Sequence, residues 1–115
     1  MSVVSEDAAA RVGRLMTAKA LPGRGDELAA ALVRVAGTLR GFPGCELYVI
    51  NQDRADPDTV YAFEVWSDEA AVNAALEAAR TAANPPVSMA AVMAMVDGPM
   101  RRVDLVPLGG VGLAE

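Results

Sequence analysis

Apolar residues recur along the chain with two different periods, and each period predicts one kind of element. The first period is helical and covers the stretch between Asp26 and Gly41. Its apolar face consists of Leu28, Leu32, Val35 and Leu39. We expect the Asp26 carboxylate to cap the start of this helix and Gly41 to end it.

Two further helical segments follow in the second half of the chain. Ser67 is the expected N-cap of a helix that runs to about Ala83, where Asn84-Pro85-Pro86 ends it. Its apolar stripe comprises Val72, Leu76 and Ala79. A shorter helix is expected from Val87 to Val96, with one face made of Met89, Val92, Met93 and Val96.

The remaining apolar runs predict strands. They cover Val12 to Leu21, Cys45 to Asn51, Thr59 to Trp66 and Met100 to Pro107. The polar loop 52–58 makes the middle two strands an antiparallel hairpin. In the strand 59–66, alternate residues on both faces are mostly apolar, which a sheet with one solvated face does not show. The sequence therefore predicts that both faces of the sheet are covered, and leaves open which residues lie on which face.

The predicted order β-α-β-β-α-β is typical of a ferredoxin-like α+β fold, a four-stranded antiparallel sheet with both helices on one face. A second copy of the chain is the simplest cover for the other face. One domain is expected over residues 12–110, between a flexible N-terminal segment at residues 1–11 and a C-terminal tail at residues 111–115.

Composition and charge narrow the range of functions. The net charge is −5 with no basic cluster, which argues against nucleic acid as a partner. One cysteine and no histidine leave no internal disulfide, no Ser-His-Asp or Cys-His catalysis and no histidine-held haem, and they disfavour structural zinc. Neither a signal peptide nor a membrane span is expected, so cytoplasmic is the expected location.

Three motifs resemble the antibiotic biosynthesis monooxygenase domain, of the dimeric α+β barrel group. They are Thr17 to Gly23 before the first helix, Gly41 to Cys45, and Phe63 to Ala71 with its Glu-x-Trp followed by Ser-Asp-Glu-Ala. Pro107 to Gly110 is similar to the usual end of the family, so the resemblance spans roughly Val12 to Gly110. It implies a homodimer that stacks its two sheets, with a pocket in each subunit between sheet and helices.

The resemblance also implies a class of activity. Members include oxygenases of aromatic polyketides that use neither metal nor flavin, haem-degrading enzymes and quinol oxidases. We expect a cofactor-independent monooxygenase, with no metal and no cofactor, acting on a flat apolar aromatic substrate of the polyketide anthrone or quinol type. The alternatives are a non-catalytic dimeric binding or assembly module and a related isomerase or cyclase of the same fold.

The chain departs from its relatives at three positions. Ala75 stands where many relatives carry a histidine, which the haem-degrading branch needs as its iron ligand. Ala62 and Val72 stand where the aromatic-polyketide oxygenases carry an asparagine and a tyrosine. Of that set only Trp66 matches, so the family's catalytic residues do not carry over as a group.

Glu64 and Trp66 are the candidate catalytic residues. A carboxylate on a mostly apolar strand is a candidate base for a substrate proton. The alternative for Glu64 is an ion pair with Arg14 or Arg102 on neighbouring strands, and the alternative for Trp66 is a core aromatic.

Five further residues are candidates for binding the substrate: Tyr48, Tyr61, Asn73, Met89 and Met93. The tyrosine hydroxyls and the asparagine amide offer hydrogen bonds to ring oxygens, and methionines suit an adaptable apolar wall. Interface tyrosines, a solvated asparagine and core methionines are the alternatives.

Overall fold

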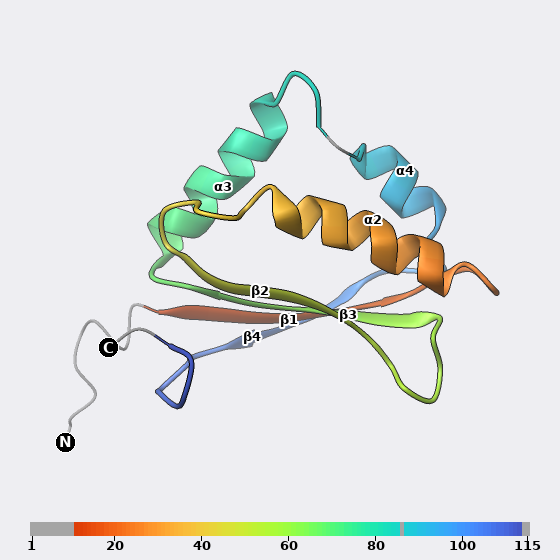
Figure 1. Ribbon diagram of the computed structural model, residues 1–115, viewed down its shortest axis with the longest axis horizontal. Coiled ribbons are helices and arrows are strands. Elements are labelled where there is room, and N and C mark those ends of the chain that lie inside the picture. Colours follow the sequence, from red (N-terminus) through yellow and green to blue (C-terminus); the bar gives the residue numbers. More distant parts are fainter. Residues whose placement is uncertain (1–10, 86, 114–115) are drawn as a thin grey trace.

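A computed structural model describes residues 11–85 and 87–113 of the chain. Four strands form one antiparallel sheet in the order β2-β3-β1-β4, and three helices lie on one of its faces (Figure 1). The strands are β1 (Val12–Lys19), β2 (Cys45–Gln52), β3 (Thr59–Trp66) and β4 (Arg101–Leu105). The helices are α2 (Gly25–Gly37), α3 (Glu69–Thr81) and α4 (Met89–Ala94). This order confirms the predicted ferredoxin-like α+β fold.

The sequence-based expectations for the two chain ends fall partly outside this description. Residues 1–10, within the segment expected to be flexible, and residues 114–115, within the expected tail, lie outside the described residues. Inside the described part, no helix has the length and hydrophobicity that crossing a membrane requires.

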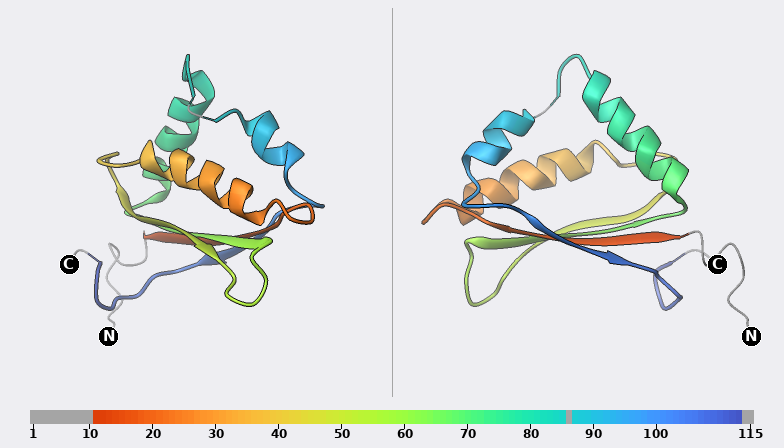
Figure 2. Two further views of the ribbon diagram at one scale, coloured as in Figure 1. Left: turned by 45° about the vertical axis from the view of Figure 1, so that its right-hand side comes forward. Right: turned by 180° about the vertical axis from the view of Figure 1, so that it is seen from behind.

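The structure assigns the two faces of β3. Val60, Ala62, Glu64 and Trp66 are buried on the side of the helices. Tyr61, Phe63 and Val65 point to the opposite, outer face, because successive side chains of a strand alternate. The views in Figure 2 show that none of the helices of the described residues covers this outer face.

Helix α2 begins differently from the prediction. Asp26 is not its N-cap. The N-cap residue is Arg24, whose side chain makes no capping hydrogen bond, and the Asp26 carboxylate accepts a hydrogen bond from Gln52 Nε2 at 2.9 Å. The start of the helix is instead held by the Asp58 carboxylate from the β2–β3 loop. It accepts hydrogen bonds from the backbone N–H groups of Gly23 at 3.0 Å and Gly25 at 2.9 Å. A Cβ at Gly25 would lie 2.0 Å from the Pro57 carbonyl oxygen, so only glycine permits this contact.

Helix α2 also ends earlier than predicted, at Gly37 rather than at Gly41. A further turn follows, in which the N–H groups of Thr38, Leu39 and Arg40 bond back to carbonyl oxygens three residues earlier. Gly41, at φ 77°, supplies the left-handed conformation that reverses the chain after this turn.

Helix α3 is capped by Asp68, not by Ser67 as expected. The Asp68 side chain accepts the N–H of Ala71 at 2.8 Å. The buried residues of this helix are Val72 and Ala75, whereas Leu76, predicted on the apolar stripe, is 58% exposed.

The buried face predicted for the short helix α4 is confirmed for Val92 and for Val96, which packs against the core, and is wrong for the two methionines. Met89 and Met93 are exposed, and Val92 and Met95 point into the core. The core cluster that contains Val92 and Met95 includes Ala18 and Ala20 of the β1 region and Leu28 of α2. Helix α4 therefore packs one end of the helical layer onto the sheet.

Candidate active site cavity

An apolar cavity of about 430 Å³ lies among α2, α3 and α4. Its described lining residues come from the end of α2 and the following loop, one face of α3, and the segment that leads to α4: Val35, Thr38, Leu39, Phe42, Ala75, Ala78, Ala79, Ala82, Asn84, Pro85, Val87 and Met89. Thr38 and Asn84 are the polar members of this set, and none of the set is ionisable. The cavity therefore suits an uncharged apolar molecule.

The wall formed by α3 is made of alanines. Ala75, Ala78, Ala79 and Ala82 recur at i, i+3, i+4 and i+7, which places them on one side of the helix. Because each side chain is a single methyl group, these residues leave the space between α2 and α3 unfilled. This spacing is the sequence signal that could have predicted the cavity.

Trp66 lies behind the cavity wall. It is 2% exposed and packs in one cluster with Val72 and Ala75, against which Leu39 and Phe42 also pack. The rings of Phe42 and Trp66 meet edge to face, with centroids 6.4 Å apart and planes at 78°. Leu39, Phe42 and Ala75 thus separate the cavity from the indole.

Glu64 is the hydrogen-bond partner of this tryptophan. The indole Nε1–H of Trp66 donates to Glu64 Oε1 at 2.7 Å, and Glu64 is 7% exposed. The alternative of an ion pair with Arg14 or Arg102 is not what the structure shows. Arg14 pairs with Glu69 at 3.5 Å and Arg102 with Asp104 at 3.0 Å.

Arg14 nevertheless lies close to this pair. It is opposite Glu64 in the register of β1 and β3. Its Nε is buried and, within the described residues, makes no hydrogen bond. The surroundings of Glu64 thus combine an indole donor with a neighbouring guanidinium.

The two tyrosines lie on opposite sides of the sheet. Tyr48 is opposite Glu64 in the register of β2 and β3 and belongs to the Trp66 cluster. Burial, and next the charge of Glu64, raise the pKa of its phenol to about 12. Tyr61 lies on the outer face, where its hydroxyl donates to Asp53 Oδ2 at 3.0 Å.

The structure does not gather the other candidate residues around the cavity. Met89 lines it, whereas Asn73 is exposed and Met93, 47% exposed, does not appear among the lining residues. Phe42 is the functional candidate that the sequence analysis missed, although the Gly-Phe-Pro-Gly turn that carries it is one of the motifs quoted above. No three His, Cys, Asp or Glu residues of the described chain come together as metal ligands would.

Fold and cavity together define a class of protein: a ferredoxin-like α+β domain with an apolar cavity inside its helical layer. A sequence profile of the family "Antibiotic biosynthesis monooxygenase" matches residues 11–83. The chain belongs to the antibiotic biosynthesis monooxygenase family. None of the curated proteins matches the sequence.

Solved structures support the assignment. A protein from Chloroflexus aurantiacus J-10-fl that carries the family's name is 30% identical, with 90% of this chain and 99% of that chain covered and a TM-score of 0.73. SnoaB, a cofactor-independent oxygenase from Streptomyces nogalater, is 17% identical over 90% of this chain and 98% of its own, with a TM-score of 0.70. A Pseudomonas aeruginosa protein is 21% identical over 89% and 98%, with a TM-score of 0.68. The latter two likenesses are of fold alone.

Proposed function

We propose that the protein is a cofactor-independent monooxygenase that binds a flat apolar aromatic substrate, of the anthrone or quinol type, in the cavity among α2, α3 and α4. The observation that carries this proposal is the cavity itself, an apolar space whose wall packs directly on Trp66. Family membership and the likeness of fold to SnoaB support the class of reaction.

The cavity has the dimensions and chemistry for such a substrate. Its volume of about 430 Å³ lies within the usual range of small-molecule sites. The alanine face of α3 and the ring of Phe42 offer flat apolar contacts to a fused ring system. Thr38 and Asn84 are the polar side chains available to place ring oxygens.

The reaction needs no more than the substrate and dioxygen. Loss of a proton from the methylene carbon of an anthrone gives an electron-rich anion, which reduces dioxygen. One oxygen atom becomes the new ring carbonyl, and the other leaves as water with the two methylene hydrogens. The substrate supplies all four electrons. The protein has to bind the ring, accept the first proton and exclude water.

Glu64 is the proposed proton acceptor, with Trp66 as the group that orients it. Its carboxylate is buried and held by the indole N–H. Because Leu39, Phe42 and Ala75 stand between the cavity and the indole, this role requires the Phe42 side chain to swing aside when substrate binds. Of the five binding residues predicted from the sequence, we propose that Met89, which lines the cavity, contacts the substrate.

Oxygen uptake with an anthrone, measured without added metal or flavin, tests the proposal. The wild-type protein should raise the rate above the uncatalysed one. Ala78→Phe, which fills the cavity, should abolish the increase, while Ala74→Phe, on an exposed position of α3 outside the lining, should keep it. Uptake equal to the uncatalysed rate, or unaffected by Ala78→Phe, contradicts the proposal.

A non-catalytic binding module is the second candidate function. The observation in its favour is that no described residue lining the cavity is ionisable, so no acid or base touches the bound molecule directly. This function predicts that the anthrone binds, that Ala78→Phe weakens binding, and that oxygen uptake stays at the uncatalysed rate.

We further propose that the protein forms a homodimer through the outer face of the sheet. Paired strands place a row of four apolar side chains across this face: Val49, Phe63, Leu15 and Val103. Val49 is 41% and Val103 52% exposed. An exposed apolar face of this kind is typical of a protein interface.

A further inference from the structure

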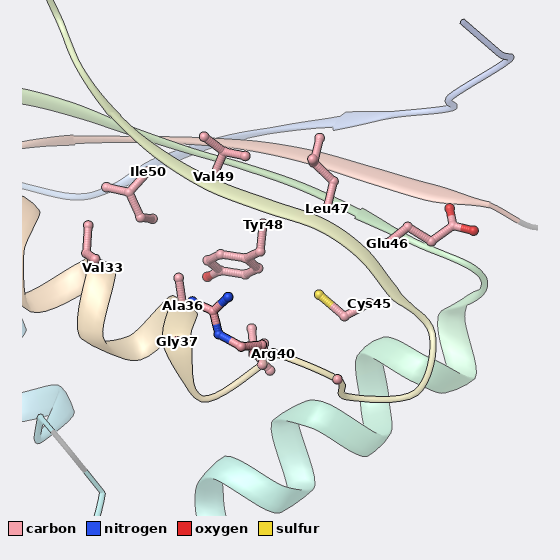
Figure 3. A pocket seen from close by; sticks show the side chains of 12 residues that line it. Val33, Ala36, Gly37, Arg40, Cys45, Glu46, Leu47, Tyr48, Val49 and Ile50 are labelled. Atoms are coloured by element: carbon pink, nitrogen blue, oxygen red, sulfur yellow. The ribbon is translucent and has the colours of Figure 1, made fainter. Parts of the chain in front are cut away.

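A second hollow lies at the opposite side of α2, between that helix and the edge strand β2 (Figure 3). This groove has a volume of about 400 Å³ and shares only Leu39 with the lining of the cavity described above. We propose that it is a separate ligand site, which binds a small carboxylic acid with a flat apolar body. The proposal does not depend on the oxygenase activity.

Most of the groove wall is apolar. The α2 side contributes Val33, Ala36 and Leu39, and β2 contributes Ile50. Tyr48 extends from β2 between these walls, with its ring and hydroxyl turned toward α2 (Figure 3). An aromatic or branched aliphatic group of a ligand would be enclosed by these side chains.

Two polar groups in the groove have no partner in the described part of the chain. The Tyr48 hydroxyl makes no hydrogen bond, and the Arg40 guanidinium makes neither a hydrogen bond nor an ion pair, with any residue that the structure describes. Both side chains line the groove (Figure 3). With its pKa raised to about 12, the Tyr48 phenol stays protonated at neutral pH and is available as a donor.

Arg40 also carries a positive charge that no carboxylate in the groove neutralises. The one carboxylate in the lining, Glu46, is already engaged by Arg11, with Nε–Oε1 at 2.7 Å and Nη2–Oε2 at 3.0 Å. Burial, and then the charge of Glu64, raise the pKa of the Cys45 thiol, which therefore stays neutral. Because Arg11 neutralises Glu46, Arg40 is the charged side chain of the described lining that has no ion-pair partner, which favours an anion.

The C-terminal end of α2 does not cancel this preference. The last carbonyl groups of a helix repel anions when they are unpaired. Here the carbonyl oxygens of Val35, Ala36 and Gly37 accept N–H bonds from the following turn. Arg40, at the end of that turn, remains the dominant charge next to the groove.

A carboxylate matches these donors better than other anions of similar size. The planar guanidinium can bond both carboxylate oxygens side by side, and the Tyr48 hydroxyl supplies a third donor. A single negative charge balances the unpaired charge of Arg40. The apolar walls require the rest of the ligand to be hydrophobic.

Calorimetry with 2-naphthoate tests the proposal, with 2-naphthamide as the uncharged control. The wild type should bind the acid and bind the amide at least about tenfold more weakly, the scale expected for losing charge-assisted hydrogen bonds. Arg40→Gln should weaken binding of the acid by a similar factor and Tyr48→Phe by a smaller one. Arg34→Gln, at an exposed position of α2 outside the groove, should bind the acid with an affinity within about twofold of the wild type.

NMR chemical shifts locate the bound acid. Amide signals of residues 45–50, which line the groove and not the other cavity, should move, whereas those of residues 75–89, which include much of the other cavity's wall, should not. Absence of binding at millimolar concentration, equal affinity for acid and amide, unchanged affinity in Arg40→Gln, or shifts confined to residues 75–89 would each overturn the proposal.

Discussion

Trp66 and Glu64 form the buried polar contact at the centre of the helix-side face. Both are almost fully buried, and the 2.7 Å hydrogen bond between them satisfies the indole N–H and one carboxylate oxygen. A carboxylate removed from water without a partner is costly, so the two residues depend on each other. Sequence alone singled out both residues, but not the bond that joins them.

Loss of the indole should cost more stability than loss of the carboxylate charge. In Glu64→Gln the amide oxygen still accepts the indole N–H, so the free energy of unfolding should fall by less than about 1 kcal/mol. Trp66→Phe leaves the buried carboxylate without its donor and should cost about 2–4 kcal/mol. Urea unfolding followed by circular dichroism measures both. An equal or smaller loss in Trp66→Phe would show that the bond contributes little.

Tyr48 should make the folded state labile to alkali. Its pKa is raised to about 12, above the ordinary value of 10, so the folded protein holds this proton over a range in which the unfolded chain releases it. Stability contributed by the neutral phenol is therefore complete below pH 10 and is lost as the pH rises through 12. Unfolding between pH 9 and pH 12 should show a shallower decline in Tyr48→Phe than in the wild type. Parallel declines would argue against this assignment.

At the scale of the elements, strands were predicted better than helix ends. The run of β-branched and aromatic residues in β3 predicts its bounds, and the hairpin follows from the polar loop beside it. The start of α2 depends on Asp58, which is 33 residues from Gly25 in sequence. Capping rules consider only neighbouring residues and cannot detect a partner so distant in sequence. They therefore predicted Asp26 as the N-cap of α2.

The candidate site was predicted only in part, because its shape also depends on contacts between residues far apart in sequence. Periodicity identifies residues that point inward, but it does not distinguish a filled core from an empty space. Tyr61 and Glu64 are three positions apart on one strand, so they lie on opposite faces of the sheet. Met93 and Asn73 lie on helices whose rotation depends on contacts elsewhere in the fold. The alanines of α3 add information that apolar periodicity lacks, because four methyl side chains on one helix face leave space beside that face.

Asp68, rather than Ser67, should control the stability of α3. Its carboxylate accepts the Ala71 N–H and places negative charge at the start of the helix. Asp68→Ala should lower the free energy of unfolding by about 1 kcal/mol. Ser67→Ala should cost much less, because the Ser67 side chain accepts no N–H of the helix. Thermal unfolding of the two variants at neutral pH measures both losses of stability. A larger loss in Ser67→Ala than in Asp68→Ala would show that Ser67 is the N-cap.

For the whole molecule, one charge on the outer face should separate the proposed dimer. Val103 is 52% exposed in the single chain, so Val103→Glu should fold normally yet place a carboxylate within the apolar row. Sedimentation velocity at micromolar concentration should show a dimer for the wild type and a monomer for Val103→Glu. Leu76→Glu, at a 58% exposed position on α3, is the matched control and should remain a dimer. A wild-type monomer would refute the homodimer.

The buried indole also provides an optical reporter. Trp66 is the only tryptophan in the chain, so nearly all intrinsic fluorescence excited at long ultraviolet wavelengths comes from one position behind the cavity wall. Dissolved oxygen, an arriving aromatic ring or protonation of Glu64 would each alter the emission of this one fluorophore. Entry of both reactants into the protein can thus be timed without attaching a label.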